Sequence, residues 1–228
     1  MQDVPYNPPP THMECCVVEN LDEVAIKNQA FAYMQQLEGW CSNDKAGTLI
    51  NLILKSRPDV VVEIGVWGGK SLVPMAYALK MNKKGKIIGI DPWSNEASLQ
   101  GLTNDENKGF WGQVDHEQVM WGLIDKLHQF DLLSQVLLIK TTSVEARPIH
   151  GIDILHIDGN HSDETSYIDV TKWAPLVKSG GLIVVDDVTW SENGVNASQG
   201  RAVEWLNSNC IKIAEFSDSS VWGVWIKP

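Results

Sequence analysis

The residues best suited to chemistry in this sequence are aspartates that end apolar runs. Asp91 closes KIIGID, Asp158 closes IDILHID, and Asp186 and Asp187 close LIVVDD. The carboxyl ends of parallel strands lie on one edge of a sheet, and ligands of such sheets bind at that edge. A carboxylate there can accept hydrogen bonds from both hydroxyls of a ribose, which is the role that we predict for Asp91.

Three of these carboxylates, Asp158, Asp186 and Asp187, end strands that we expect to be neighbours. Like charges that converge in a cleft are costly unless a cation or a shared proton offsets them. Oxygen ligands without cysteine favour a hard ion, so the three aspartates form a candidate Mg²⁺ site. The alternative is structural: Asp158 would cap the turn before Gly159, and Asp187 would be solvated at its strand end.

A histidine follows the first of these carboxylates. His161 comes three residues after Asp158, and its ordinary pKa suits a general base at neutral pH. His156 lies inside the strand and is expected in the core, while His116 is a second candidate base or a substrate contact. Most loop histidines have no chemical role, so a structural reading of His161 stays open.

The stretch VVVEIGVWGGKS, residues 60–71, organises the rest of the chain. Its β-branched residues predict a buried strand that stops at Gly65, and the apolar spacing that follows predicts a helix over 70–81. A strand, a glycine-rich turn and a helix form the nucleotide-binding corner of doubly wound domains. The dinucleotide pattern Gly-x-Gly-x-x-Gly does not fit, because Val66 or Trp67 stands where a small residue is needed. A tight connection without a ligand is the alternative.

Predicted strands and helices alternate along most of the chain, which favours an α/β fold with a doubly wound, mostly parallel sheet. The runs CIKIAEF and VWGVWIK predict a terminal hairpin, so the last strand would enter the sheet antiparallel. The other predicted strands cover 60–65, 86–91, 136–141, 152–158 and 182–187, and the later helices cover 163–178 and 198–208.

The sequence before the central strand divides into two parts. Residues 1–18 form a Pro-rich arm that we expect to be disordered or packed on a neighbouring subunit of a homo-oligomer. Residues 19–58 carry two helices, over 21–37 and from Ser42 or Asn43 to Arg57. We expect residues 59–228 to form one large domain.

One segment departs from the alternation. Residues 92–112 form a long polar stretch at the carboxyl end of the sheet, before a helix expected over 113–129. Long loops at this edge are often lids or substrate-binding surfaces, and a surface insertion without a role is the alternative.

Composition excludes several classes of protein. The net charge of −11 and the isoelectric point near 4.9 weigh against nucleic-acid binding. Four cysteines show neither zinc-ligand spacing nor a disulfide framework and are expected to be reduced thiols. The sequence has no signal-peptide pattern and no apolar stretch of membrane-spanning length, so we expect a cytoplasmic protein that does not bind membranes.

Five motifs in order make the sequence resemble class I S-adenosylmethionine (SAM)-dependent methyltransferases. These are VEIGVWGGKS, GIDPW, IKTTS, HIDGNHS and GGLIVVDDV, within a resemblance that covers residues 40–227. The first motif is similar to that of metal-dependent O-methyltransferases of the catechol and macrocin types. The resemblance implies a Rossmann-like, seven-stranded sheet with an antiparallel final strand, SAM as cofactor and the use of Mg²⁺.

When the family's site residues are matched to positions in this sequence, the resemblance implies the following contacts. Glu63, Gly65, Gly69, Ser71 and Asp158 would line the cofactor site near its methionine and ribose, Asp91 would hold the ribose, and Trp93 and Ser143 would lie near the adenine. Asp158, Asp186 and Asp187 match the residues that bind the divalent cation. An aspartate at 187 favours the sugar-type enzymes, in which this position is often Asp.

The implied reaction is O-methylation of a hydroxyl on a small molecule, sugar-like or otherwise hydroxylated, with Asp158 and His161 as catalytic residues. His161 takes the place of the lysine base of catechol-type enzymes, because HSDET holds no lysine. An NAD(P)-binding oxidoreductase and a non-catalytic methyltransferase-like binding protein are the alternatives.

Overall fold

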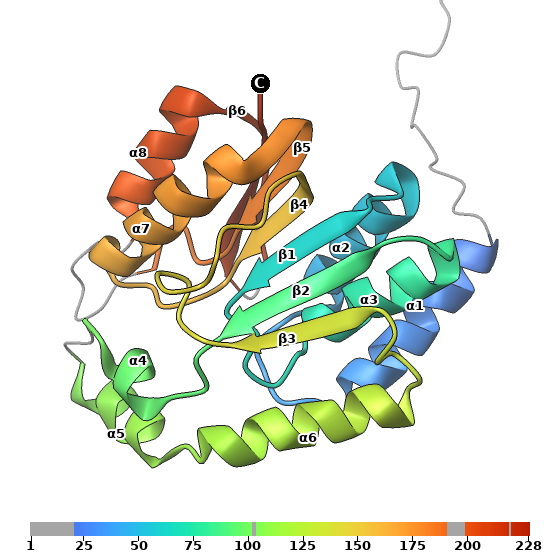
Figure 1. Ribbon diagram of the computed structural model, residues 1–228, viewed down its shortest axis with the longest axis horizontal. Helices are drawn as coiled ribbons and strands as arrows, with labels where there is room; N and C mark the ends of the chain where they lie inside the picture. Colours follow the sequence, from blue (N-terminus) through green and yellow to red (C-terminus); the bar gives the residue numbers. More distant parts are fainter. Residues whose placement is uncertain (1–20, 102–103, 191–198, 219) are drawn as a thin grey trace, which may run out of the picture.

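The fold is built on one seven-stranded sheet with helices on both faces (Figure 1). The computed structural model describes residues 21–101, 104–190, 199–218 and 220–228, so the predicted arm over 1–18 lies outside the described residues. Strand order is β3-β2-β1-β4-β5-β7-β6, with β1 to β5 parallel and β7 antiparallel to both of its neighbours. The strands are β1 (Val60–Ile64), β2 (Lys86–Asp91), β3 (Val136–Lys140), β4 (Ile152–Ile157), β5 (Val177–Val185), β6 (Ile211–Ser217) and β7 (Val221–Ile226). The predicted doubly wound α/β fold with its antiparallel hairpin is confirmed.

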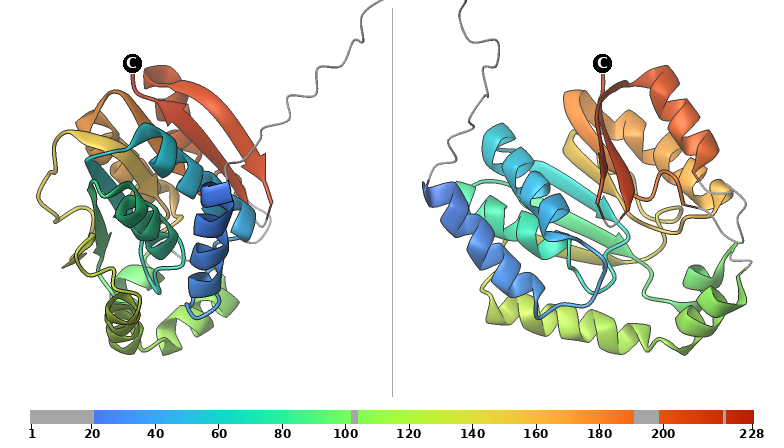
Figure 2. Two further views of the ribbon diagram at one scale, coloured as in Figure 1. Left: turned by 90° about the vertical axis from the view of Figure 1, so that its right-hand side faces the viewer. Right: turned by 180° about the vertical axis from the view of Figure 1, so that it is seen from behind.

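Helices α1, α2 and α3 cover one face of the sheet, and α7 and α8 cover the other (Figure 2). Helix α6 runs along the β3 edge and packs with the first group. The helices are α1 (Leu21–Met34), α2 (Asn43–Ser56), α3 (Leu72–Asn82), α4 (Asn95–Leu99), α5 (Asp105–Gln113), α6 (His116–Gln129), α7 (Asp163–Trp173) and α8 (Gly200–Asn209), with a 3₁₀ turn at Ala174–Leu176.

The pleat of the strands divides the core in two. Val61 and Ile154 belong to the core under α1, α2, α3 and α6, whereas their chain neighbours Val62 and Leu155 belong to the core under α7 and α8. Successive side chains of a strand point to opposite faces, so strands covered on both faces must be apolar throughout. This explains the continuous apolar runs of the sequence.

Residues 92–112 differ from the prediction of a long loop, because they contain α4 and most of α5. Ser94 caps α4 by accepting a hydrogen bond from the Ala97 N–H, and Asn104 caps α5 by accepting one from the Glu106 N–H at 2.8 Å. The loop prediction is wrong here, because short helices with mostly polar residues lack the apolar periodicity by which a helix is predicted from sequence.

Two other boundaries shift for local reasons. The helix predicted over 163–178 ends at Trp173, because Pro175 follows at once and cannot continue an α-helix. The strand predicted over 182–187 starts earlier, at Val177, and stops at Val185. Asp186 and Asp187 therefore lie just beyond the strand, at the edge where ligands bind.

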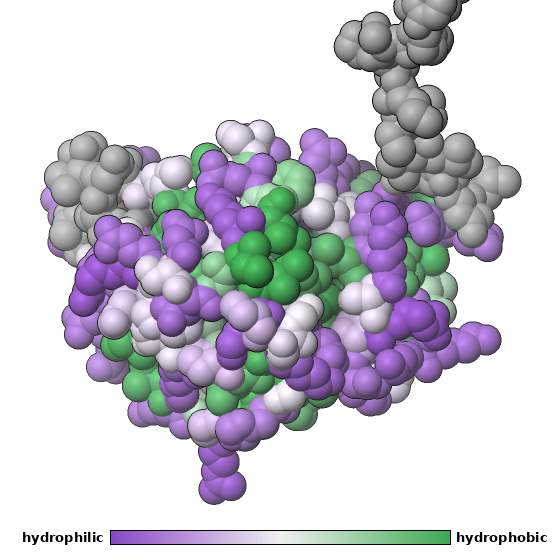
Figure 3. All heavy atoms as spheres, turned by 90° about the horizontal axis from the view of Figure 1, so that it is seen from above, coloured by the Kyte–Doolittle hydropathy of each residue, from purple (hydrophilic) through white to green (hydrophobic). Residues whose placement is uncertain are grey.

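The surface is mostly hydrophilic on the face seen in Figure 3, with hydrophobic residues gathered near its middle. At the outer edge of the sheet, β6 carries the exposed side chains of Ile211 and Ile213. The homo-oligomer expected from the sequence stays a prediction. Among the described residues, no helix combines the length and the apolar character needed to cross a membrane.

Candidate active site

A cavity of about 1010 Å³ opens at the carboxyl ends of the strands. Its floor holds residues that end or follow β1, β2, β4 and β5, because the parallel strands all finish on this edge of the sheet. Its walls come from α4, α5 and the first half of α7. The cavity brings together nearly all the motifs that the sequence singled out.

The turn after β1 requires glycine at one position. Gly65 has a φ of +82°, and a Cβ on this residue would lie 2.0 Å from the carbonyl oxygen of Asp158. Only glycine allows two backbone segments to approach so closely. The turn and the end of β4 are therefore in direct contact, and both line the cavity.

Asp91 fixes the same turn from the end of β2. One carboxylate oxygen accepts hydrogen bonds from the N–H groups of Val66 and Trp67, each at 2.9 Å, and the other accepts one from Trp93 N–H at 2.7 Å. A carboxylate offers about four lone-pair positions, so one remains for a ligand. Asp91 lines the cavity, and its predicted contact with ribose stays a prediction.

Glu63 lies behind the cavity wall. It is fully buried, accepts a hydrogen bond from Ser71 Oγ at 2.5 Å, and lies 2.9 Å from His156 Nδ1 through the same oxygen. Of the described residues, Ser71 lines the cavity and Glu63 does not. Glu63 therefore orients Ser71, and His156 is the core histidine expected from the sequence.

The other predicted cofactor residues divide in the same way. Ser143 lines the cavity, and its hydroxyl donates a hydrogen bond to the buried carboxylate of Asp169. Gly69 and Trp93 are outside the described lining. Trp93 is buried, and its indole N–H donates to the Trp67 carbonyl at 3.0 Å, which fixes the turn from behind.

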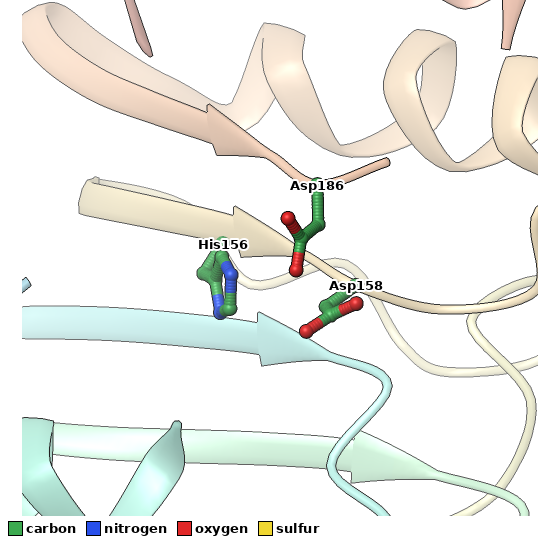
Figure 4. A group of neighbouring side chains, drawn as sticks. All are labelled: His156, Asp158 and Asp186. Atoms are coloured by element: carbon green, nitrogen blue, oxygen red, sulfur yellow. The ribbon is translucent and has the colours of Figure 1, made fainter. Parts of the chain in front are cut away.

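The carboxylates at the ends of β4 and β5 share a buried lysine. Figure 4 shows Asp158 and Asp186 pointing toward one another from these neighbouring strands. Lys45 Nζ lies 3.2 Å from Asp158 Oδ2 and forms a direct ion pair with Asp186 Oδ2, and Ser220 Oγ donates to Asp186 Oδ1 at 3.0 Å. The lysine side chain is only 1% exposed. A buried lysine without charged partners would be strongly unfavourable, so the three groups form one unit.

Burial and charge together set the pKa shifts in this unit. Burial alone would lower the pKa of Lys45, but Asp158 and Asp186 raise it above its usual value, so the ammonium persists. Burial would raise the pKa of Asp158, but Lys45 holds it below the usual range. Burial and the neighbouring Asp158 raise the pKa of Asp186.

His161 forms a second unit with Asp187. Its Nε2 lies 3.1 Å from Asp187 Oδ2, and its Nδ1 lies 3.2 Å from Gln199 Nε2, which also donates to the Asp186 carbonyl at 2.8 Å. Burial would lower the pKa of His161, but the hydrogen bond and charge of Asp187 raise it. His161 and Asp187 both line the cavity.

The predicted metal ligands do not gather as one set. Potential ligand atoms form two groups that share Asp158, one with His156 and Asp186 and the other with His161 and Asp187. Lys45 already pairs with both carboxylates of the first group and offsets part of their negative charge. As placed, the residues do not fit a Mg²⁺ ion held jointly by Asp158, Asp186 and Asp187.

Aromatic side chains form one wall of the cavity. Trp40 stacks on Trp67 with ring centroids 4.6 Å apart and planes 9° apart, and Phe110 and Trp111 pack edge-on against them. Trp40 is 64% exposed, an unusual position for so large an apolar ring. We name these four residues the aromatic wall.

Sequence reasoning missed Lys45, Gln199 and Trp40. A signal existed for Lys45, because it shares the helical spacing of the buried Leu49 and Ile53. No local pattern distinguishes Gln199 or Trp40, whose roles depend on residues distant in the chain.

Comparison with known proteins identifies the family. Residues 62–188 match the family model described as a methyltransferase domain. The chain belongs to this methyltransferase family. The match spans the turn after β1, the ends of β2 and β4, and both aspartates after β5, and it leaves the NAD(P)-binding alternative without support.

Relatives of this methyltransferase domain include O-methyltransferases. A caffeoyl-CoA O-methyltransferase of Stellaria longipes is 24% identical over 175 residues, which cover 76% of this chain and 64% of that protein. The chain therefore spans less than two thirds of this relative. Protein y4gI of Sinorhizobium fredii is 25% identical over 152 residues, which cover 65% of this chain and 15% of that protein.

The fold of the methyltransferase domain also matches solved structures. The O-methyltransferase TomG of Streptomyces achromogenes, solved in complex with SAM, has a TM-score of 0.59 and 16% identity, with 93% of this chain and 92% of that chain covered. At this identity the likeness concerns the fold.

Proposed function

We propose that this chain is a SAM-dependent methyltransferase that methylates a hydroxyl oxygen of a small molecule. The observation that carries this proposal is that the glycine turn after β1 and the charged groups after β4 and β5 line the same cavity. Family membership supports it, and so does the O-methyltransferase activity of two similar proteins, the enzyme of Stellaria longipes and TomG.

The residues present fit SAM. Gly65 allows close approach at the turn, Asp91 retains a lone pair, and Ser71 and Ser143 offer hydroxyls at separate positions in the lining. Asp158 places a carboxylate in the same cavity, which suits a cationic sulfonium. In our proposal Asp91 holds the ribose, Ser143 lies near the adenine, and Ser71 and Asp158 lie near the methionine.

The chemistry is a direct displacement. Bound SAM supplies the methyl group: the C–S bond breaks, its electron pair stays on sulfur, and a new C–O bond forms to the acceptor. The protein orients the acceptor hydroxyl and takes its proton.

His161 is the proton acceptor in this proposal. Asp187 holds Nε2, so the new proton goes to Nδ1, which faces Gln199 in the present arrangement. The acceptor hydroxyl must therefore displace the Gln199 amide from Nδ1. Asp187 then stabilises the imidazolium, as a carboxylate does behind a catalytic histidine.

The aromatic wall supports an acceptor that presents an apolar ring face, either of a sugar or of a planar ring. A sugar-like or other hydroxylated metabolite remains our proposed substrate class. Assistance by Mg²⁺ and a cytoplasmic location, both expected from the sequence, stay predictions, and the placement of Lys45 weighs against the first.

A labelled methyl-transfer assay tests the proposal. The wild type should transfer the methyl group of SAM to at least one acceptor in a panel of catechols, sugars and caffeoyl-CoA. His161→Asn should lower kcat by about 10²–10⁴-fold, because general base catalysis contributes that much. His150→Asn, a change at an exposed histidine, should leave the rate unchanged. An equal rate in wild type and His161→Asn would remove His161 from the mechanism.

A further inference from the structure

We propose that Lys45 is a positioning residue that supplies, from within the chain, the positive charge required by Asp158 and Asp186, so that methyl transfer here needs no divalent cation. The functional half of this inference rests on the proposed methyltransferase activity. The structural half, that a lysine excludes the metal, stands on the ion pairs alone.

Local sequence places Lys45 at this point. Ser42 caps α2 and accepts a hydrogen bond from the Lys45 N–H at 3.0 Å, which sets the start of the helix. Lys45 then shares the inward stripe with Leu49 and Ile53, both fully buried. Leu49 and Ile53 pack in the core, and the Lys45 ammonium at the start of this helix face reaches the carboxyl ends of β4 and β5.

The ammonium meets both aspartates at once. It contacts one oxygen of Asp158, at 3.2 Å, and one of Asp186. The side chains of Lys45 and Asp186 are 1% and 4% exposed and that of Asp158 is 25% exposed, and both aspartates line the cavity. Lys45 is not part of the described lining and thus acts from behind, mainly through Asp158, which is the most exposed member of the unit.

The same contacts oppose a metal ion. Mg²⁺ requires several oxygen ligands in near-octahedral geometry at short distance. Asp186 has Lys45 on one oxygen and Ser220 on the other, and Asp187 is paired with His161. A divalent ion that used Asp186 would therefore have to displace Lys45 into a buried position without a partner or displace Ser220, and one that used Asp187 would have to displace His161.

Metal binding tests the inference without SAM or an acceptor. Electron paramagnetic resonance of Mn²⁺ titrated into the wild-type protein should show no stoichiometric binding in the micromolar range. Lys45→Met keeps much of the side-chain volume, removes the charge and leaves two facing carboxylates, so this variant should gain Mn²⁺ binding and a higher Tm with Mn²⁺. Lys80→Met, which removes an exposed ion pair with Asp131, is the matched control and should bind no more Mn²⁺ than wild type.

Micromolar Mn²⁺ binding by the wild type, or a folded Lys45→Met that binds no more Mn²⁺ than wild type, would overturn the inference. If Lys45→Met does not fold, the wild-type titration still decides. Once an acceptor is found, wild-type methyl transfer should be unchanged by EDTA, and Mn²⁺ should restore at least part of the activity lost in Lys45→Met. A purely structural lysine would not produce this rescue.

The two proposals can fail separately. Absence of SAM-dependent methyl transfer would remove the proposed function and leave the Mn²⁺ result intact. Loss of wild-type activity in EDTA, with methyl transfer otherwise established, would overturn the metal-free inference alone.

Discussion

At the scale of single residues, the aspartates of this site have different hydrogen-bond and ion-pair partners. Backbone N–H groups hold Asp91, an ammonium holds Asp158 and Asp186, and an imidazole holds Asp187. Each partner stabilises negative charge by a different route. Asp169 is the exception, because its main neighbour is the neutral hydroxyl of Ser143.

Asp169 makes stability depend on pH. Burial raises the pKa of its carboxyl to about 7, against smaller lowering effects of Ser143 and Lys172. Between its ordinary value of 3.8 and about 7, the folded state holds a proton that the unfolded state has lost. The free energy of unfolding therefore falls as pH rises through this window, by about 4 kcal/mol in total from this group.

Asp169→Asn should remove this dependence. Urea unfolding at pH 5 and pH 8 should show that the variant gains stability relative to wild type at the higher pH. The amide oxygen can still accept the hydrogen bond from Ser143, so that contact is retained. Parallel pH curves for the two proteins would contradict the assignment.

At the scale of elements, the turn after β1 depends on one glycine. Gly65→Ala would place a Cβ against the Asp158 carbonyl at a positive φ, so it should lower the free energy of unfolding by more than about 2 kcal/mol. Gly109→Ala in α5 is the control. Its Cβ would meet no described atom within 4 Å, and helix propensity should raise stability by about 0.5–1 kcal/mol. Chemical denaturation measures the free energy of unfolding of both variants. An equal change in the two variants would contradict the close contact at Gly65.

Elements with local signals could be predicted from the sequence, and those set by distant contacts could not. The apolar runs and the cap at Ser42 are local, so the parallel strands and the start of α2 were predictable. Helices α4 and α5 could not be predicted in the same way, because their only local signals are the polar N-cap residues Ser94 and Asn104. The role of Lys45 depends on Asp158 and Asp186, 113 and 141 positions away in the chain, so a metal was the reasonable prediction for the carboxylates alone.

At the scale of the whole molecule, the aromatic wall assembles from three segments: the α1–α2 connection, the turn after β1, and α5. Such a surface forms only when the complete fold is present. Trp40→Ala should raise the KM of a ring-bearing acceptor by about three- to tenfold, which corresponds to one aromatic contact. Affinity for S-adenosylhomocysteine should not change. A change in cofactor affinity with an unaltered acceptor KM would place the wall in the cofactor site instead.

The most direct test of the central claim is a calorimetric titration of S-adenosylhomocysteine into the wild-type protein. We predict micromolar binding at one site, the same with and without EDTA. Asp91→Ala should weaken binding by at least about 1.5–3 kcal/mol, the value of one hydrogen bond to a charged group, because it also frees the turn N–H groups that Asp91 holds. Asp131→Asn, which removes an exposed ion pair and keeps a side chain that tolerates the positive φ of this residue, should bind like wild type. No detectable binding under either condition would contradict the assignment of this cavity to SAM.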